Sequence, residues 1–174
     1  AFDASVTWAM GCPVDAISGV STTDYLTPSF TKGSEVSQKN ESATFMEETY
    51  THFLVTTPLA TTDINRSISF KITPTGTFKP SSISYQFANQ GWGDGRYTLV
   101  VECGNYNKVL KDKVTPIRDN QTSTKPYDEI NLSGITATPE APIIFTLYFQ
   151  SKNDNTSNRP YIMRNFIVNG VATA

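Results

Sequence analysis

Hydrophobic residues alternate with polar ones along most of this chain, and a period of two fits an extended strand, not a helix. The alternation is clearest over residues 67–72, 82–87, 96–101 and 143–149. Successive side chains of a strand point to opposite faces, so each segment can turn one hydrophobic face to a core and the other face to solvent. We therefore expect the chain to fold mainly into strands.

Turn residues separate these segments. Residues 73–76 (Thr-Pro-Thr-Gly) and 89–91 (Asn-Gln-Gly) carry Pro or Gly where a chain reversal needs them. No stretch of twelve residues keeps a hydrophobic helical face free of Pro or of clustered β-branched residues. Further strands are expected over residues 5–10, 50–56, 107–110 and 161–168.

Eight or more strands in 174 residues predict two packed antiparallel sheets, which is an all-β sandwich of the jelly-roll type. The length suits one domain, so residues 1–174 are expected to form a single module. The chain starts at Ala1 without Met and ends in a run of small, uncharged residues. Both ends look cut, and we expect a module excised from a larger protein.

Composition excludes several classes of function. Charged residues make up 17% of the chain, while Thr and Ser, at 24 and 16 residues, supply much of the polar surface. A net charge of −2 argues against binding to a nucleic-acid backbone. The longest apolar stretch, residues 141–149, is too short to span a membrane. One His and two Cys are too few for a Cys/His zinc site. Structural calcium stays open, since the chain has no D-x-D-x-D-G loop but many scattered oxygen ligands.

A chain rich in Thr, Ser and Asn is typical of exported β-proteins, so a secreted or cell-surface location is expected, as a monomeric module. Cys12 and Cys103 could close a loop of about 90 residues, which would stabilise the fold by ~4 kcal/mol. Two buried free thiols are the alternative, and the sequence leaves both open.

The central and C-terminal parts carry a recognisable set of motifs. The segments are Ile68–Ile72, Thr73–Tyr85, Gly91–Val101 with Gly104 and Arg118, Ile144–Tyr148, Arg159–Tyr161 and Asn165–Gly170. Over about residues 50–171 this pattern resembles the jelly-roll carbohydrate-binding modules of secreted or surface polysaccharide-degrading enzymes of gut Bacteroidetes. The resemblance implies a non-catalytic module that holds an enzyme on a plant or host glycan, for example xylan or pectin.

The segment 91–97 (Gly-Trp-Gly-Asp-Gly-Arg-Tyr) is the sharpest candidate for such a site. Sugar rings stack on flat aromatic faces, and planar polar groups bind their hydroxyls. Trp92 lies between two glycines, and Asp94 and Arg96 offer an acceptor and a donor beside it. The alternative is that Trp92 folds back onto the core while Asp94 caps a turn.

Other candidates lie in polar turns. Each combines an aromatic, amide or guanidinium group with a loop setting, and the set comprises Tyr106, Arg118, Asn153, Asn158 and Tyr161. Trp8 shares a strand face with Val6 and Met10 and is expected in the core.

An enzyme, a protein-binding domain and a polysaccharide-binding module remain open as functions. A glycosidase needs two facing carboxylates, and Glu47, Glu48 and Glu102 make no persuasive pair. A Ser-His-Asp hydrolase would have to use His52, and no G-x-S-x-G motif is present. A protein-binding adhesin or scaffold domain is compatible with the same fold. The aromatic and Asn-rich loops favour polysaccharide binding without a cofactor.

Overall fold

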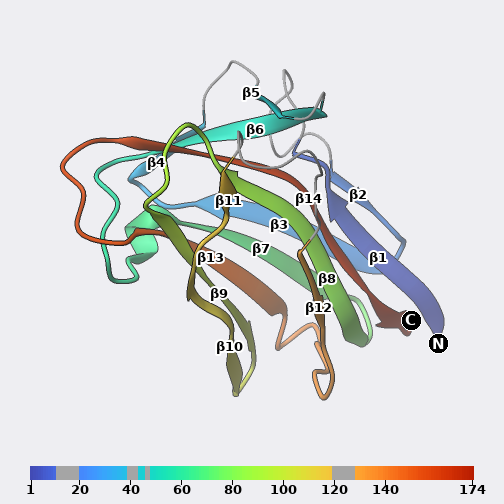
Figure 1. The fold of residues 1–174 in the computed structure, drawn as a ribbon. Coiled ribbons are helices and arrows are strands. Elements are labelled where there is room, and N and C mark those ends of the chain that lie inside the picture. Colours follow the sequence, from blue (N-terminus) through green and yellow to red (C-terminus); the bar gives the residue numbers. More distant parts are fainter. Residues whose placement is uncertain (11–19, 39–42, 46–47, 119–127) are drawn as a thin grey trace.

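The computed structural model describes residues 1–10, 20–38, 43–45, 48–118 and 128–174. For strand residues 20–21, 43–45, 48–50 and 117–118 it describes the backbone alone. Within these ranges the chain is a two-layer β-structure whose helical content is a single 3₁₀ turn, η1 (Ile64–Arg66). The all-β sandwich expected from the alternation is confirmed (Figure 1).

One layer is a five-stranded antiparallel sheet in the order β10-β9-β13-β7-β3. Its strands are β3 (Leu26–Lys32), β7 (Ser67–Pro74), β9 (Gly95–Cys103), β10 (Tyr106–Val114) and β13 (Ile143–Ser151).

The second layer has nine strands and follows the path β11-β8-β14-β1-β2, with β12 paired to β8 and with β6 linking β4 and β5 to β14. Every pair is antiparallel except the two-residue pair of β11 with β8. The strands are β1 (Phe2–Trp8), β2 (Val20–Thr22), β4 (Val36–Gln38), β5 (Ala43–Phe45), β6 (Glu48–Val55), β8 (Phe78–Asn89), β11 (Ile117–Arg118), β12 (Asp128–Asn131) and β14 (Arg159–Ala172).

Strand β3 was not predicted from the sequence, because Pro28 interrupts the alternation of Leu26 and Phe30. Proline removes a ladder hydrogen bond and is found mainly on edge strands. β3 is the edge of its sheet, so the missing N–H costs little there.

Aromatic rings from both sheets meet between the layers. Phe70 of β7 stacks on Phe166 of β14, with ring centroids 4.0 Å apart and planes 4° from parallel. Trp8 and Phe145 pack edge-on or tilted against this pair, and all four side chains have no exposed surface. The expected core position of Trp8 is therefore confirmed.

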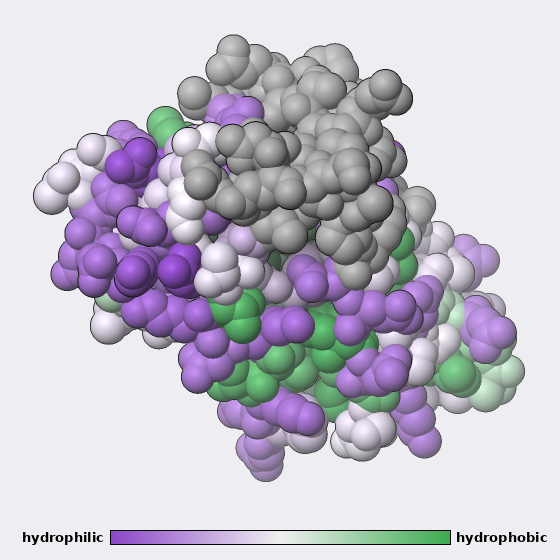
Figure 2. All heavy atoms as spheres, in the orientation of Figure 1, coloured by the Kyte–Doolittle hydropathy of each residue, from purple (hydrophilic) through white to green (hydrophobic). Residues whose placement is uncertain are grey.

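The chain ends lie side by side in Figure 1, because Phe2 of β1 pairs with Ala172 of β14. On the face shown in Figure 2, hydrophobic side chains gather between β10 and β12, where the edges of the two sheets approach each other. Leu110 and Ile130 of these strands are partly buried and pack against the core.

Replacing Phe166 by Ala should lower the free energy of unfolding by about 3–5 kcal/mol, because it removes a buried ring and leaves a cavity in the aromatic layer. Guanidinium denaturation measures the change. Ile64→Ala is the control, since Ile64 is 60% exposed and its loss should cost no more than about 0.5 kcal/mol. Equal effects of the two substitutions would contradict this account of the core.

Candidate functional site

Trp92 lies in the loop between β8 and β9, and its indole faces the protein. The residue is only 7% exposed, and its Nε1 donates a hydrogen bond to the carbonyl oxygen of Pro160 at 2.8 Å. The ring meets Tyr161 edge-on at 5.4 Å, and the guanidinium carbon of Arg159 lies 5.2 Å from its centroid. The exposed platform predicted from the flanking glycines is therefore wrong, because these neighbours cover the ring.

Arg96 and Asp94 also form hydrogen bonds at the β8–β9 hairpin. The Arg96 guanidinium donates to the carbonyl oxygens of Gly93 and Gly95, at 3.2 and 2.8 Å. The backbone carbonyl of Asp94 accepts from the Lys152 N–H at 2.7 Å. The Asp94 side chain is exposed. Arg96 thus binds backbone carbonyls of its own loop, while the Asp94 carboxylate faces solvent.

The Asn-rich loop between β13 and β14 braces the same end of the sandwich. The side-chain oxygen of Asn158 accepts from the Thr57 N–H at 3.3 Å, and that of Asp154 accepts from the Ala60 N–H at 2.9 Å. Asn153 is exposed. We call residues 56–63, 90–94 and 152–158 the loop end. Its hydrogen bonds run mainly between its own segments.

Tyr161 belongs to the core as well, which corrects its prediction as an accessible ligand. It has no exposed surface, and its hydroxyl donates to the carbonyl oxygen of Gln150 at 2.7 Å. Burial raises the pKa of its phenol well above the ordinary value.

The remaining predicted residues do not join the loop end. Tyr106 begins β10, beyond the turn that follows β9, and is half-buried against the core. The backbone of Arg118 pairs with Asn89, and its side chain lies outside the described structure. The structure therefore gathers Trp92, Asp94, Arg96, Asn153, Asn158 and Tyr161 at one end of the sandwich, with Tyr106 at the other end of β9.

A groove lies on the outer face of the five-stranded sheet. It was not predicted from the sequence. It encloses about 410 Å³. Its floor is formed by Val100 of β9, Val109 of β10 and Tyr148 of β13. Val109 pairs with Val100, and Tyr148 pairs with Thr98. Val109 is exposed and Tyr148 is half-buried. We call this the outer groove.

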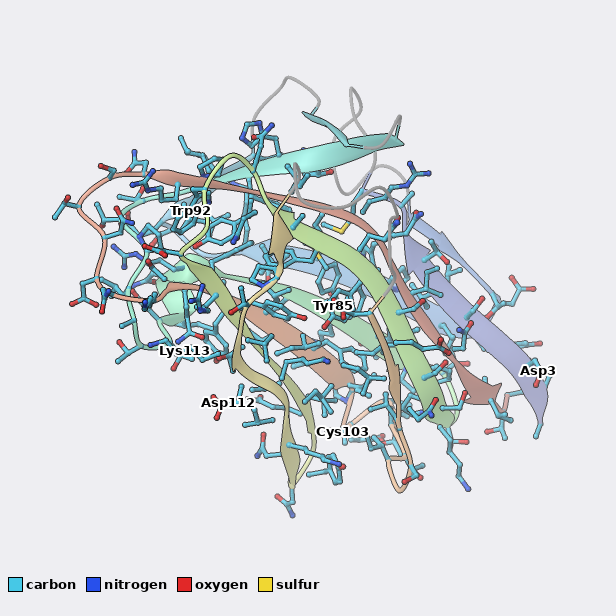
Figure 3. The ribbon with its side chains drawn as sticks, viewed as in Figure 1. Asp3, Tyr85, Trp92, Cys103, Asp112 and Lys113 are labelled. Atoms are coloured by element: carbon cyan, nitrogen blue, oxygen red, sulfur yellow. The ribbon has the colours of Figure 1, made fainter. Side chains whose placement is uncertain are left out.

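Polar groups surround this floor. Glu102 of β9 pairs with Asn107 of β10, and Lys108 and Asp112 complete the wall. Figure 3 shows Asp112 on the outer side of β9 and β10. Burial, and to a smaller extent the Glu102 carboxylate, raises the pKa of Tyr148. The signal available in the sequence was an aromatic and two valines on the strand face opposite the core.

A chain of hydrogen-bonding groups lies inside the sandwich near the β10–β12 edge. The hydroxyls of Tyr85 and Tyr97 are 2.8 Å apart, and Tyr97 donates to Asp128 at 3.4 Å. Burial raises the pKa of Asp128, while the charge of Lys111 and the bond from Tyr97 oppose that rise. Burial also raises the pKa values of both tyrosines.

Metal-binding groups are sparse. Among the described residues, no three His, Cys, Asp or Glu side chains come together in a way that could hold an ion. Cys103 is a buried free thiol whose sulfur contacts the carbonyl oxygens of Thr136 and Ala141, and Cys12 lies outside the described residues. Burial raises the pKa of the Cys103 thiol. The described helical turn is far too short to cross a membrane.

Comparisons with known proteins yield remote structural neighbours. No family model matches the sequence, and no curated protein matches it. The CBM22-1 xylan-binding domain of Xyn10C from Paenibacillus barcinonensis is 13% identical, with a TM-score of 0.44 over 83% of this chain and 87% of that one. The family 11 carbohydrate-binding module from Clostridium thermocellum, solved with a β-1,3-1,4-mixed-linked tetrasaccharide, is 10% identical, with a TM-score of 0.42 over 97% and 96%.

A viral protein is as similar as these modules. The VP2 subviral particle of infectious bursal disease virus is 6% identical, with a TM-score of 0.44 over 98% of this chain and 32% of that one. The argument for function rests on this chain's own residues.

We expect Trp92→Ala to lower the free energy of unfolding by about 3 kcal/mol, because it removes a buried ring. Trp92→Phe keeps most of the volume but loses the bond to Pro160, which should cost about 1 kcal/mol or more. Asp94→Ala is the matched control, because Asp94 lies two residues from Trp92 and its side chain is exposed. Thermal melting of the three variants checks the order, and a Trp92→Ala variant as stable as Asp94→Ala would restore the exposed platform.

Asp128→Asn should change the pH dependence of stability. A raised pKa means that the folded state binds this proton more tightly than the unfolded chain does, so the contribution of Asp128 is full below its ordinary pKa of 3.8 and is lost as the pH rises through the raised value. Asn can still accept from Tyr97 and carries no charge. The variant should melt above the wild type at about pH 7, and the two should converge at about pH 3. A lower melting temperature for the variant at neutral pH would show that Lys111 outweighs burial.

Proposed function

We propose that this chain is a non-catalytic module that binds a polysaccharide in the outer groove and holds an attached enzyme on it. The observation that carries the proposal is the composition of the groove. A half-buried tyrosine and two valines form its floor, and carboxylate, amide and ammonium groups form its walls.

This combination suits a sugar chain. A pyranose ring has apolar C–H faces that pack on an aromatic ring, and hydroxyls around its edge that need hydrogen-bond partners. Tyr148 supplies the aromatic surface, while Glu102, Asn107 and Asp112 supply acceptors and donors. A volume of about 410 Å³ is in the range of small-ligand sites.

The charges of the groove favour a neutral polysaccharide, such as xylan, over an acidic one, such as pectin. Glu102 and Asp112 carry two negative charges and Lys108 carries one positive charge. A uronate chain would bring further carboxylates against these groups, at a cost in Coulomb repulsion.

Catalysis is the second candidate, and one observation speaks for it. Glu102 and Asp112 line the same groove, and a glycosidase uses two carboxylates. A triad hydrolase finds less support, because His52, the single histidine of the chain, is only 7% exposed on β6. We favour binding alone. A secreted or surface location is part of the proposal and is supported by the Thr- and Ser-rich composition. The proposal also includes a monomeric state.

Tyr148→Ala should weaken binding about tenfold or more, which corresponds to about 1.4 kcal/mol, because it removes the aromatic floor. Tyr148→Phe keeps the ring and should retain most of the affinity. Affinity electrophoresis in xylan, mannan, mixed-linkage β-glucan and pectin measures the effect. Equal retardation of the wild type and Tyr148→Ala in the polymer that is bound would exclude the outer groove as the site.

Glu102→Gln tests the polar wall against Glu129→Gln, a matched control on the exposed face of β12. Only the first should reduce retardation. Both variants and the wild type are also incubated with each polymer, and reducing ends are measured. Steady release by the wild type that Glu102→Gln abolishes would replace the binding module with a glycosidase.

A further inference from the structure

Two exposed aromatic rings lie at the end of the sandwich that carries both chain termini. Tyr25 is 47% exposed and Phe2 is 36% exposed. Their ring centroids are 5.4 Å apart, and their planes are tilted by 52°. The aromatic layer between the sheets does not include them, so their surface is available to a ligand.

The backbone of Tyr25 is held in an unfavourable conformation. Its φ of +74° is left-handed, a region that residues other than Gly and Asn seldom adopt. Its carbonyl oxygen accepts a hydrogen bond from the Thr75 N–H at 2.9 Å, which ties the turn before β3 to the turn after β7. A glycine would fit this position without strain, whereas the tyrosine packs on Phe2 and still stays 47% exposed. Strain of this kind is often found at binding sites.

The rings border a depression on the nine-stranded sheet. A hollow of about 460 Å³ is lined by Phe2, Asp3, Thr22, Thr23, Asp24 and Tyr25. A second hollow, of about 380 Å³, extends along the outer face of the sheet over β1, β14 and β8. Asp3 and Thr23 line both, so the two hollows adjoin.

At Gly170 the backbone of β14 forms part of the floor of the second hollow. The register of β14 against β8 shifts between Asn169 and Gly170. A Cβ on Gly170 would lie 2.3 Å from the carbonyl oxygen of Lys79, so the close approach of the two strands requires glycine. Ser5, Ser81 and Asn169 add hydroxyl and amide groups around it.

The chemistry of the combined depression is that of a neutral sugar site. Asp3 and Asp24 can each accept bonds from two hydroxyls, and among the described residues no Lys or Arg lines either hollow. An anionic glycan would meet two carboxylates and no cation.

We infer that this depression, which we call the Tyr25 site, is a second binding site for a neutral polysaccharide. The inference rests on the proposed function and adds to it. Asp3 belongs to the nine-stranded layer and Asp112 to the five-stranded layer, and Figure 3 shows them on opposite sides of the molecule. One chain can therefore be bound on each face, so the module joins two polysaccharide chains. Two weak sites linked in this way also raise the apparent affinity.

The test compares wild type, Tyr148→Ala, Tyr25→Gly and the double variant on soluble xylan, galactomannan and mixed-linkage β-glucan. Affinity electrophoresis measures binding, and turbidity of the mixed solutions measures cross-linking. We expect Tyr148→Ala to keep a residual retardation that the double variant loses. Each single variant should abolish the turbidity that the wild type produces, and Tyr25→Gly should weaken apparent affinity about tenfold or more.

Stability provides the control. Glycine relieves the left-handed strain, so Tyr25→Gly should melt at or above the wild-type temperature, while Tyr25→Phe should keep both binding and turbidity. A Tyr25→Gly variant that binds and cross-links like the wild type would overturn the Tyr25 site. If Tyr148→Ala alone then abolishes retardation, the proposed function stands without the second site.

The other outcomes separate the two proposals. Loss of all binding in Tyr25→Gly, with Tyr148→Ala unchanged, would keep the Tyr25 site and remove the outer groove. Stronger retardation in polygalacturonate than in the three neutral polymers would overturn the chemistry assigned to the Tyr25 site. A wild type that binds none of these polymers would overturn both proposals.

Discussion

The stack of Phe70 on Phe166 joins the two sheets, and the rest of the molecule is arranged around it. These rings and their neighbours fill the space between the layers, and a close-packed interior of this kind leaves no room for a ligand. For the described residues, recognition of another molecule therefore falls to the outer sheet faces, the sheet edges or the ends of the sandwich. The largest aromatic residues are buried between the sheets, so the aromatic residues available to a ligand are the smaller, exposed ones.

The loop end illustrates how packing and hydrogen bonding can use residues that look suited to a ligand. Trp92 is covered by Tyr161 and Arg159, Arg96 binds the carbonyl groups of its own hairpin, and Asn158 braces a neighbouring loop. Buried polar groups need partners, and a compact arrangement of long loops supplies them from within. The same side chains cannot at once close the sandwich and remain free for a sugar.

The two outer faces differ in charge in a way that bears on what they can bind. The outer groove combines two carboxylates with one ammonium group, whereas the Tyr25 site has carboxylates and no cation. Among the described residues that line them, neither the outer groove nor the Tyr25 site has the net positive charge that would attract a uronate or a sulfated chain. With sites on opposite sheets, the module would cross-link polysaccharide chains. Its apparent affinity for an insoluble surface would exceed the affinity of either site alone.

The amino-acid sequence by itself determined the longer alternating strands, the two-sheet architecture and much of the core, because side chains alternate across a strand and only one register buries the hydrophobic set. It also placed Glu102 on the strand face opposite Leu99 and Val101, as observed. Only the tertiary structure decided which aromatic residues remain exposed. The position of Trp92 depends on Pro160 and Tyr161, some seventy residues away. The outer groove exists because β9 pairs with β10 on one side and with β13 on the other, which brings Val100, Val109 and Tyr148 together. Local pattern sets the direction of a side chain along its strand, but exposure depends on what distant segments place over it.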